Sequence, residues 1–170
     1  MPTMETLSER PQAIPPSILG SEVFARFEAE PDTLVIPVVD NDRPVGLLER
    51  TAFLLKIAGP YGHALYSGRP ISHVMDREPA VVEAGVSIDA FCDIMLKGGP
   101  SALLRGFIVT RDGLYHGVGT AATMLQAVNQ RQREQNQELA EQAAVLNDTR
   151  TQALASARAK SQFLAIMSHE

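Results

Sequence analysis

The pattern of apolar and polar positions divides the chain into two unlike parts. From about residue 17 to residue 128, short apolar runs alternate with glycine, proline and polar turns, which is typical of a domain of mixed helices and strands. Residues 129–170 contain no glycine and no proline, and glutamine, alanine, glutamate, leucine and arginine dominate. These residues favour helix, so this part predicts one long helix. Residues 1–16 carry four prolines and little periodicity, and we expect an irregular N-terminal arm.

The part between the arm and the helix contains an internal repeat. Residues 36–48 form an apolar run, a polar turn and a second apolar run that ends around glycine, and residues 107–119 follow the same pattern 71 residues later. A helical pattern precedes each copy, and another follows it over residues 50–57 and 121–128. Two copies of helix, strand, hairpin, strand and helix predict one pseudo-symmetric α/β (α+β) domain.

Composition argues against several function classes. The net charge is −5 and no Lys/Arg cluster stands out, which argues against binding nucleic acid or an anionic membrane surface. The N-terminus lacks a basic region followed by an apolar run, and no apolar stretch approaches the ~20 residues that cross a bilayer, so we expect a cytoplasmic protein. Cys92 is the only cysteine, and His63, His73 and His116 lack metal-ligand spacing, so we expect no internal disulfide and no metal site.

The repeat resembles a tandem pair of CBS domains. The resemblance covers about Ser17 to Val128 and is clearest at residues 71–82, where an Ile-x-x-Val-Met-x-x-x-Pro segment opens the second copy. It implies a CBS-like sensor domain in which clefts between the repeats bind adenosine nucleotides or related ligands. The ligand signature of the family is Gly, two residues, Thr or Ser, two residues, and Asp. Its hydroxyl contacts phosphate and its carboxylate holds ribose hydroxyls.

Neither copy carries this signature in full. The first copy has Glu49 at the hydroxyl position and Ala52 at the carboxylate position. The second keeps Thr120 but has Thr123 in place of the aspartate. Because Glu49 would repel a phosphate, we expect a different ligand or a purely dimerising role rather than standard adenine-nucleotide binding. If a small molecule does bind, the residues expected near the clefts are Glu49, Arg50, Arg69, Thr120 and Thr123.

Apolar residues on the long helix predict a coiled coil. Leu139, Leu146 and Ala153 recur at seven-residue intervals, although polar residues interrupt the seam. A single helix of this kind is not stable alone, so residues 129–158 predict a parallel homodimeric coiled coil. A thin seam suits a signalling rod that changes its rotation between two states, and a plain spacer would show the same pattern.

The end of the chain resembles the H-box of sensor histidine kinases. The usual form of this motif is Ala-Lys-Ser-x-Phe-Leu-Ala-x-Met-Ser-His-Glu, and residues 159–170 match every specified position. The resemblance implies that these residues begin the dimerisation and phosphotransfer helix. His169 would be the phosphoacceptor, because a neutral imidazole nitrogen is a competent nucleophile toward a γ-phosphoryl group. Glu170 would act as general base or orient the ring.

The two resemblances together imply the sensing and dimerisation part of a longer bacterial kinase. The parent would use ATP and Mg²⁺ to phosphorylate His169 and would pass the phosphoryl group to an aspartate of a response regulator. This chain shows no ATP-binding domain or further cofactor motif, so we expect it to be inactive by itself. Two alternatives stay open: a nucleotide-binding CBS module that acts as a metabolic sensor, and a dimerisation module that binds no ligand.

Overall fold

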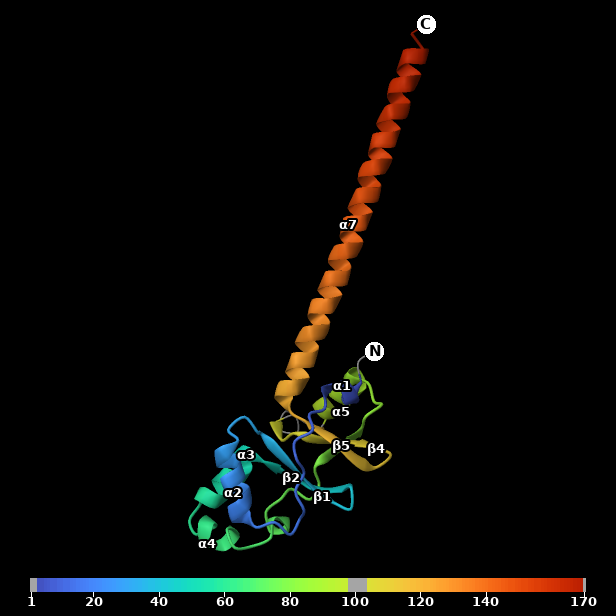
Figure 1. Ribbon diagram of the computed structural model, residues 1–170. Helices are drawn as coiled ribbons and strands as arrows, with labels where there is room; N and C mark the ends of the chain where they lie inside the picture. Colours follow the sequence, from blue (N-terminus) through green and yellow to red (C-terminus); the bar gives the residue numbers. More distant parts are fainter. Residues whose placement is uncertain (1–2, 98–103, 170) are drawn as a thin grey trace. The chain divides into compact units, whose positions relative to one another are not determined.

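Two structural units make up the chain, Met1–Gln126 and Ala127–Glu170 (Figure 1). The structure is a computed structural model, and it describes residues 3–97 and 104–169. The first unit holds all the strands and the shorter helices, and the second is helical.

The first unit contains the two predicted repeats. Each has a helix, a β-hairpin and a second helix, and the second repeat adds a leading strand. The first repeat consists of α2 (Gly20–Ala29), β1 (Val35–Asp40), β2 (Arg43–Glu49) and α3 (Arg50–Ala58). The second consists of β3 (Ala80–Glu83), α5 (Ile88–Lys97), β4 (Phe107–Arg111), β5 (Leu114–Gly119) and the start of α7 (Ala121–Met167). The connector between them includes α4 (Gly62–Tyr66) and a 3-10 turn, η1 (Ile71–His73).

Both hairpins turn through two residues with positive φ. The φ angles are 48° and 62° at residues 41–42, and 56° and 75° at residues 112–113. This type I′ geometry matches the twist of the strands, and Asn, Asp and Gly adopt it at least cost. Each hairpin also shifts register at the equivalent position, after Val38 and after Val109. Both features recur at a spacing of 71 residues, which confirms the internal repeat.

The repeats differ in the segment that runs parallel to the first hairpin strand. In the second repeat, β3 pairs in parallel with β4 over four residues. In the first repeat, a single parallel bridge joins Ile14 to Val38. The Ile14 N–H donates to Pro37 O at 3.0 Å, and the Val39 N–H donates to Ile14 O at 2.9 Å. The next donor along such a ladder would be Pro16, which has no N–H, so the pairing stops after one bridge.

In the first repeat, the connector crosses the second hairpin strand at a glycine. Leu47 and Asp76 form an antiparallel bridge with N···O distances of 3.0 and 2.9 Å. A Cβ atom on Gly46 would lie 2.4 Å from the Met75 sulfur and 2.9 Å from Asp76 O. The missing side chain at Gly46 therefore gives the connector room to pair with β2.

The second repeat is crossed in the same way by the N-terminal arm. Val118 and Glu9 form the equivalent bridge, with N···O distances of 2.8 and 2.9 Å. A Cβ atom on Gly117 would lie 2.7 Å from Glu9 O and 2.8 Å from the Ser8 Cβ atom. The glycine that the repeats share thus marks the crossing of an incoming segment in both copies.

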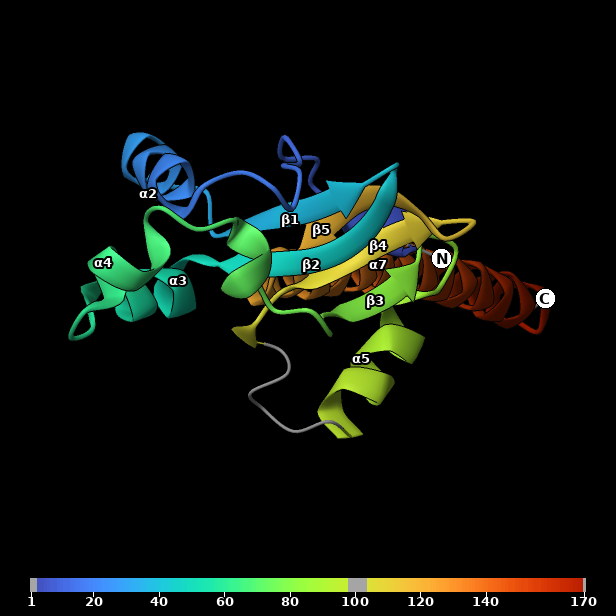
Figure 2. The same ribbon diagram turned by 90° about the horizontal axis from the view of Figure 1, so that it is seen from below.

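The two hairpins lie side by side and share a small apolar cluster (Figure 2). The buried members of this cluster are Val35, Leu47, Ile108 and Val118. Each repeat also buries a pair of phenylalanine rings, with centroids 5.6 Å apart in the first and 4.6 Å apart in the second. Burial of these apolar side chains is the main stabilising term for the domain.

The N-terminal arm is attached to the second repeat by side chains as well as by backbone. It contains the short helix α1 (Met4–Leu7), whose Met4 side chain is fully buried. The Arg10 guanidinium lies 2.8 Å from the Nε2 atom of His116. Burial, together with the nearby positive charge of Arg10, lowers the pKa of His116, so the ring is neutral at pH 7 and can accept this hydrogen bond.

In the second unit, α7 runs without a break to Met167. Every side chain from residue 132 to residue 169 is exposed in the single chain, including Leu139 and Leu146 of the predicted seam. The dimeric coiled coil remains a prediction that a single chain does not test. No helix within residues 3–97 and 104–169 is long and apolar enough to span a bilayer.

Because an incoming segment crosses the hairpin at the shared glycine, we expect any side chain at this position to lower the stability of the fold. We expect Gly117→Ala to destabilise the protein by about 1–3 kcal/mol, because the new Cβ would overlap backbone that has to shift. Gly85→Ala is the matched control, since a Cβ there meets nothing within 4 Å. The measurement is the free energy of unfolding by denaturant titration. Equal stability of the two variants would contradict the crossing.

Candidate functional site

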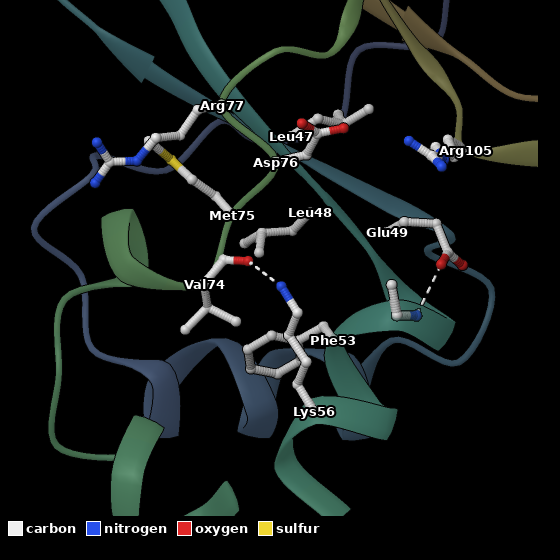
Figure 3. A pocket seen from close by; sticks show the side chains of 11 residues that line it. Leu47, Leu48, Glu49, Phe53, Lys56, Val74, Met75, Asp76, Arg77 and Arg105 are labelled. Carbon is white, nitrogen blue, oxygen red and sulfur yellow. Dashed lines mark hydrogen bonds between the residues drawn. The ribbon is translucent and has the colours of Figure 1, made fainter. Parts of the chain in front are cut away.

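A cleft in the first unit, called cleft 1, has a volume of about 560 Å³. It lies where the end of β2, the first turns of α3, the connector and the segment before β4 come together (Figure 3). The residues that line it are Leu47, Leu48, Glu49, Ala52, Phe53, Lys56, Val74, Met75, Asp76, Arg77 and Arg105. The backbone crossing described above holds the connector wall of this cleft in place.

Glu49 lines cleft 1, but its carboxylate is engaged by the protein. It is the N-cap of α3 and accepts hydrogen bonds from the N–H groups of Thr51 and Ala52, both at 2.8 Å. Figure 3 shows the second of these bonds. The first N–H groups of a helix have no partner within the helix and attract anions. Glu49 satisfies two of them and supplies the negative charge itself. A ligand phosphate therefore cannot use this helix terminus unless Glu49 moves away.

Cleft 1 contains a carboxylate on its connector wall and none at the position of the signature aspartate in α3. Ala52, at the family's aspartate position, offers only a methyl group. Asp76 lines the cleft from the connector, and its Oδ1 atom accepts a hydrogen bond from the Glu78 N–H at 3.0 Å. A carboxylate has about four acceptor sites, so Asp76 retains capacity for hydroxyl donors of a ligand.

Three cationic side chains also line cleft 1. Lys56 donates from Nζ to Val74 O at 3.0 Å, and Arg77 donates from Nε and Nη2 to Ser72 O at 3.1 and 2.8 Å. Arg105 has no hydrogen bond or ion pair to any residue that the structure describes. With two carboxylates against three cations among the described residues, the lining carries an excess of positive charge.

A second cleft, cleft 2, occupies the pseudo-equivalent place in the second repeat. Its volume is about 210 Å³. Among its described lining residues are two acids, Glu9 and Asp32, and no cation. Thr120 and Thr123 line it too, and they cap α7 reciprocally, with Thr123 Oγ1 accepting from the Thr120 N–H at 2.8 Å. The 71-residue offset places Leu34 here where cleft 1 has Arg105.

Two of the predicted site residues line neither cleft. Arg50 points back into the first repeat, where its Nη1 atom donates to Phe27 O at 2.6 Å and its guanidinium lies 5.5 Å from the Phe27 ring centroid. Arg69 lies in the loop before η1, where its backbone carbonyl accepts from the Gly20 N–H at 3.0 Å. The expectation that these arginines line the clefts is therefore not met: the Arg50 side chain is packed on a ring, and Arg69 belongs to a loop that lines neither cleft. The predicted residues that do line a cleft are Glu49, Thr120 and Thr123.

The cations of cleft 1 were missed from the sequence, although part of the signal was present. Lys56 lies one helical turn beyond Ala52 and so shares its face of α3. Arg77 belongs to the segment that opens the second copy. Arg105 lies two residues before the second hairpin, where the first copy has an apolar residue, Leu34. Only the folded chain shows that these three segments converge.

The predicted phosphoacceptor lies at the end of the second unit. His169 lies two residues after the end of α7 and is exposed, and its backbone N–H donates to Ile166 O at 3.4 Å. The apolar side chains of the same motif, Phe163, Leu164 and Met167, are 63–66% exposed. Glu170 lies outside the described residues. No group of three or more His, Cys, Asp or Glu side chains that could hold a metal is present within residues 3–97 and 104–169.

Comparisons with known proteins give a consistent picture of the fold. No protein-family model matches the chain, and no curated protein matches it. A putative acetoin utilization protein (AcuB) from Vibrio cholerae superposes with a TM-score of 0.65 at 17% identity, over 81% of this chain and 97% of that one. CBSX2 in complex with AMP superposes with a TM-score of 0.61 at 18% identity, over 78% and 99%.

A third similar structure is a putative archaeal homologue of g-AMPK from Methanocaldococcus jannaschii. Its TM-score is 0.59 at 16% identity, over 75% of this chain and 48% of that one. Identities this low carry an argument about the fold alone. The superpositions cover 75–81% of this chain. The chain has the α/β fold of a CBS-domain pair, followed by a long C-terminal helix.

Proposed function

We propose that the first unit is a ligand-sensing regulatory module that binds a nucleotide in cleft 1. The observation that carries this proposal is the combination of an apolar wall and surplus positive charge in one cleft of about 560 Å³. Ligand sites of drug-sized molecules range over ~300–1,000 Å³ and combine apolar surface with a few placed polar groups. The complex of CBSX2 with AMP supports the proposal, because that protein shares the fold.

Each part of a nucleotide has a counterpart in the lining. A base fits against the apolar side chains that include Leu48, Phe53 and Val74. The carboxylate of Asp76 accepts hydrogen bonds from ribose hydroxyls, a role that the family assigns to the position of Ala52. Lys and Arg side chains are the usual partners of phosphate oxygens. This assignment departs from the family signature. The first N–H groups of α3 are already bonded to Glu49, so the side-chain cations of the cleft bind the phosphate in their place.

We further propose that the module regulates phosphotransfer at His169 in a longer sensor histidine kinase. This part rests on the H-box motif, and the observation that favours it is the continuity of α7. The same helix that closes the second repeat at Ala121 runs to Met167 and ends beside His169. A parallel dimer would cover the exposed apolar residues of the helix and bring two H-boxes together. Ligand binding would then bias the rotation of the helices, and the parent would use ATP, Mg²⁺ and a response regulator.

The competing function is dimerisation without a ligand. Cleft 1 would then be a solvated groove whose cations serve only to bind the connector, as two of them do through Val74 O and Ser72 O. Arg105 has no such role in the described residues, and this favours the ligand-binding function.

Ligand binding predicts a thermal shift. With a panel of adenine and guanine nucleotides, including cyclic dinucleotides, at millimolar concentration, we expect at least one compound to raise the melting temperature. A ligand at about 100 times its Kd adds about 2.7 kcal/mol, which corresponds to roughly 5–10 °C for a protein of this size. Differential scanning fluorimetry measures the shift. If no nucleotide moves the transition, the dimerisation function is favoured.

The position of the Glu49 carboxylate in cleft 1 predicts that its removal raises the affinity of the protein for anionic nucleotides. Glu49→Ser keeps a good N-cap residue but removes a negative charge from the cleft, so we expect anionic nucleotides to bind roughly threefold to tenfold more tightly. Glu28→Ser removes the same charge from the exposed face of α2 and should leave affinity unchanged. Isothermal titration calorimetry gives both values. A weaker affinity in Glu49→Ser would mean that the carboxylate contacts the ligand directly.

The H-box predicts a single phosphorylated residue in the parent kinase. We expect His169→Asn in the full-length parent to abolish ATP-dependent, acid-labile phosphorylation, since asparagine offers no nucleophilic ring nitrogen. His63→Asn changes an exposed histidine of the connector helix α4 and should leave the labelling intact. Autoradiography after acid and base treatment measures both variants. Undiminished acid-labile phosphate in His169→Asn would refute the assignment.

A further inference from the structure

The charges of the two clefts are opposite, although the clefts are related by the repeat. Among the residues that the structure describes, cleft 1 is lined by three cations and two acids, whereas cleft 2 is lined by two acids and no cation. Cleft 2 also has a volume of about 210 Å³, below the ~300 Å³ at which small-molecule sites begin. A phosphorylated ligand would meet repulsion and too little room in cleft 2. This difference favours one ligand per chain.

The cations of cleft 1 are spread along its length and are not gathered at one point. Figure 3 shows Arg77 and Arg105 at opposite sides of the cleft, with Lys56 reaching up between them. A single phosphate group is compact and would contact only part of such an array. A chain of two or three phosphates is longer, carries more charge, and can meet separated cations at the same time.

Arg105 is the cation with the most unused capacity. Its guanidinium has five N–H donors, and none of them bonds to a residue that the structure describes. Lys56 and Arg77 already each donate to a backbone carbonyl. The chain next to Arg105 is also fixed closely against the first repeat, because a Cβ on Gly106 would lie 2.9 Å from the Val35 Cγ1 atom. The backbone that carries Arg105 is therefore held at the cleft, and its side chain has no bond to any residue within 3–97 and 104–169.

The three cations come from different parts of the fold. Lys56 belongs to α3 of the first repeat, Arg77 to the connector, and Arg105 to the segment before β4 of the second repeat. A ligand that contacts Lys56 and Arg105 together would tie the two repeats to each other. Binding of such a ligand would thus restrict the movement of one repeat relative to the other, which gives a sensor a physical output.

We propose that cleft 1 selects nucleoside di- and triphosphates over monophosphates, binds one per chain, and uses Arg105 of the second repeat as the residue that determines this selectivity. This inference rests on the proposed nucleotide-binding function and names the ligand class of the same site.

Isothermal titration calorimetry with adenosine, AMP, ADP, ATP, GMP and GDP tests the proposal directly. The expected result is one site per chain, with ADP and GDP binding about tenfold more tightly than the corresponding monophosphates, and adenosine most weakly. One additional charge-assisted contact accounts for a factor of this size. Equal affinity for AMP and ADP, or two sites per chain, would overturn the proposal while leaving a nucleotide-binding function in place.

Arg105→Ala supplies the second arm, with Arg43→Ala as the control of equal charge on the exposed end of the first hairpin. We expect Arg105→Ala to reduce the preference for ADP over AMP to about threefold or less and to leave the melting temperature of the ligand-free protein unchanged. Arg43→Ala should retain the full preference. Identical ligand preferences in both variants would remove Arg105 from the site. Absence of binding by every nucleotide to the unsubstituted protein would overturn the proposed function together with this inference.

Discussion

The arrangement of the first unit depends on one backbone interaction that occurs twice. In each repeat an incoming segment forms an antiparallel bridge with the second hairpin strand, Asp76 with Leu47 and Glu9 with Val118. Both bridges require a glycine beneath the crossing segment, because backbone oxygen lies under 3 Å from where a Cβ would stand. The crossing brings the connector beside the first turns of α3 and so builds the wall of cleft 1. The same interaction at Glu9 makes the N-terminal arm a wall of cleft 2.

Features that depend on local sequence could be predicted. Features that depend on distant segments of the chain meeting in the fold could not. The hairpins and their spacing of 71 residues follow from residue types that favour type I′ turns and buried strands. The start of the first repeat at Ile14 was hidden, because a single bridge among prolines leaves no alternating pattern. Arg50 was placed wrongly at the cleft, since its sequence position beside Glu49 does not show that the two side chains point in different directions.

Cleft 1 lacks the family's ligand signature, and its other lining residues still supply the charges that a nucleotide needs. The sequence correctly shows that Glu49 and Ala52 cannot act as the family's hydroxyl and carboxylate. It does not show that Asp76 and the three cations face the same space, because they come from segments far apart in the chain. The expectation of a different ligand or a purely dimerising role, in place of standard adenine-nucleotide binding, rested on the signature alone. The volume and charge of cleft 1 favour nucleotide binding as the proposal, and the proposed phosphotransfer role rests only on the sequence motif of residues 159–170.

The central claim is that a phosphorylated nucleotide occupies cleft 1 and leaves cleft 2 empty. Titration of the ¹⁵N-labelled protein with ADP, followed by amide chemical shifts, tests it most directly. The account predicts that shifts concentrate at Glu49–Phe53, Val74–Arg77 and Arg105, on both repeats and the connector. The amides of Thr120 and Thr123 should stay unchanged. Shifts centred on those two threonines, or no shifts at saturating ADP, would contradict the account.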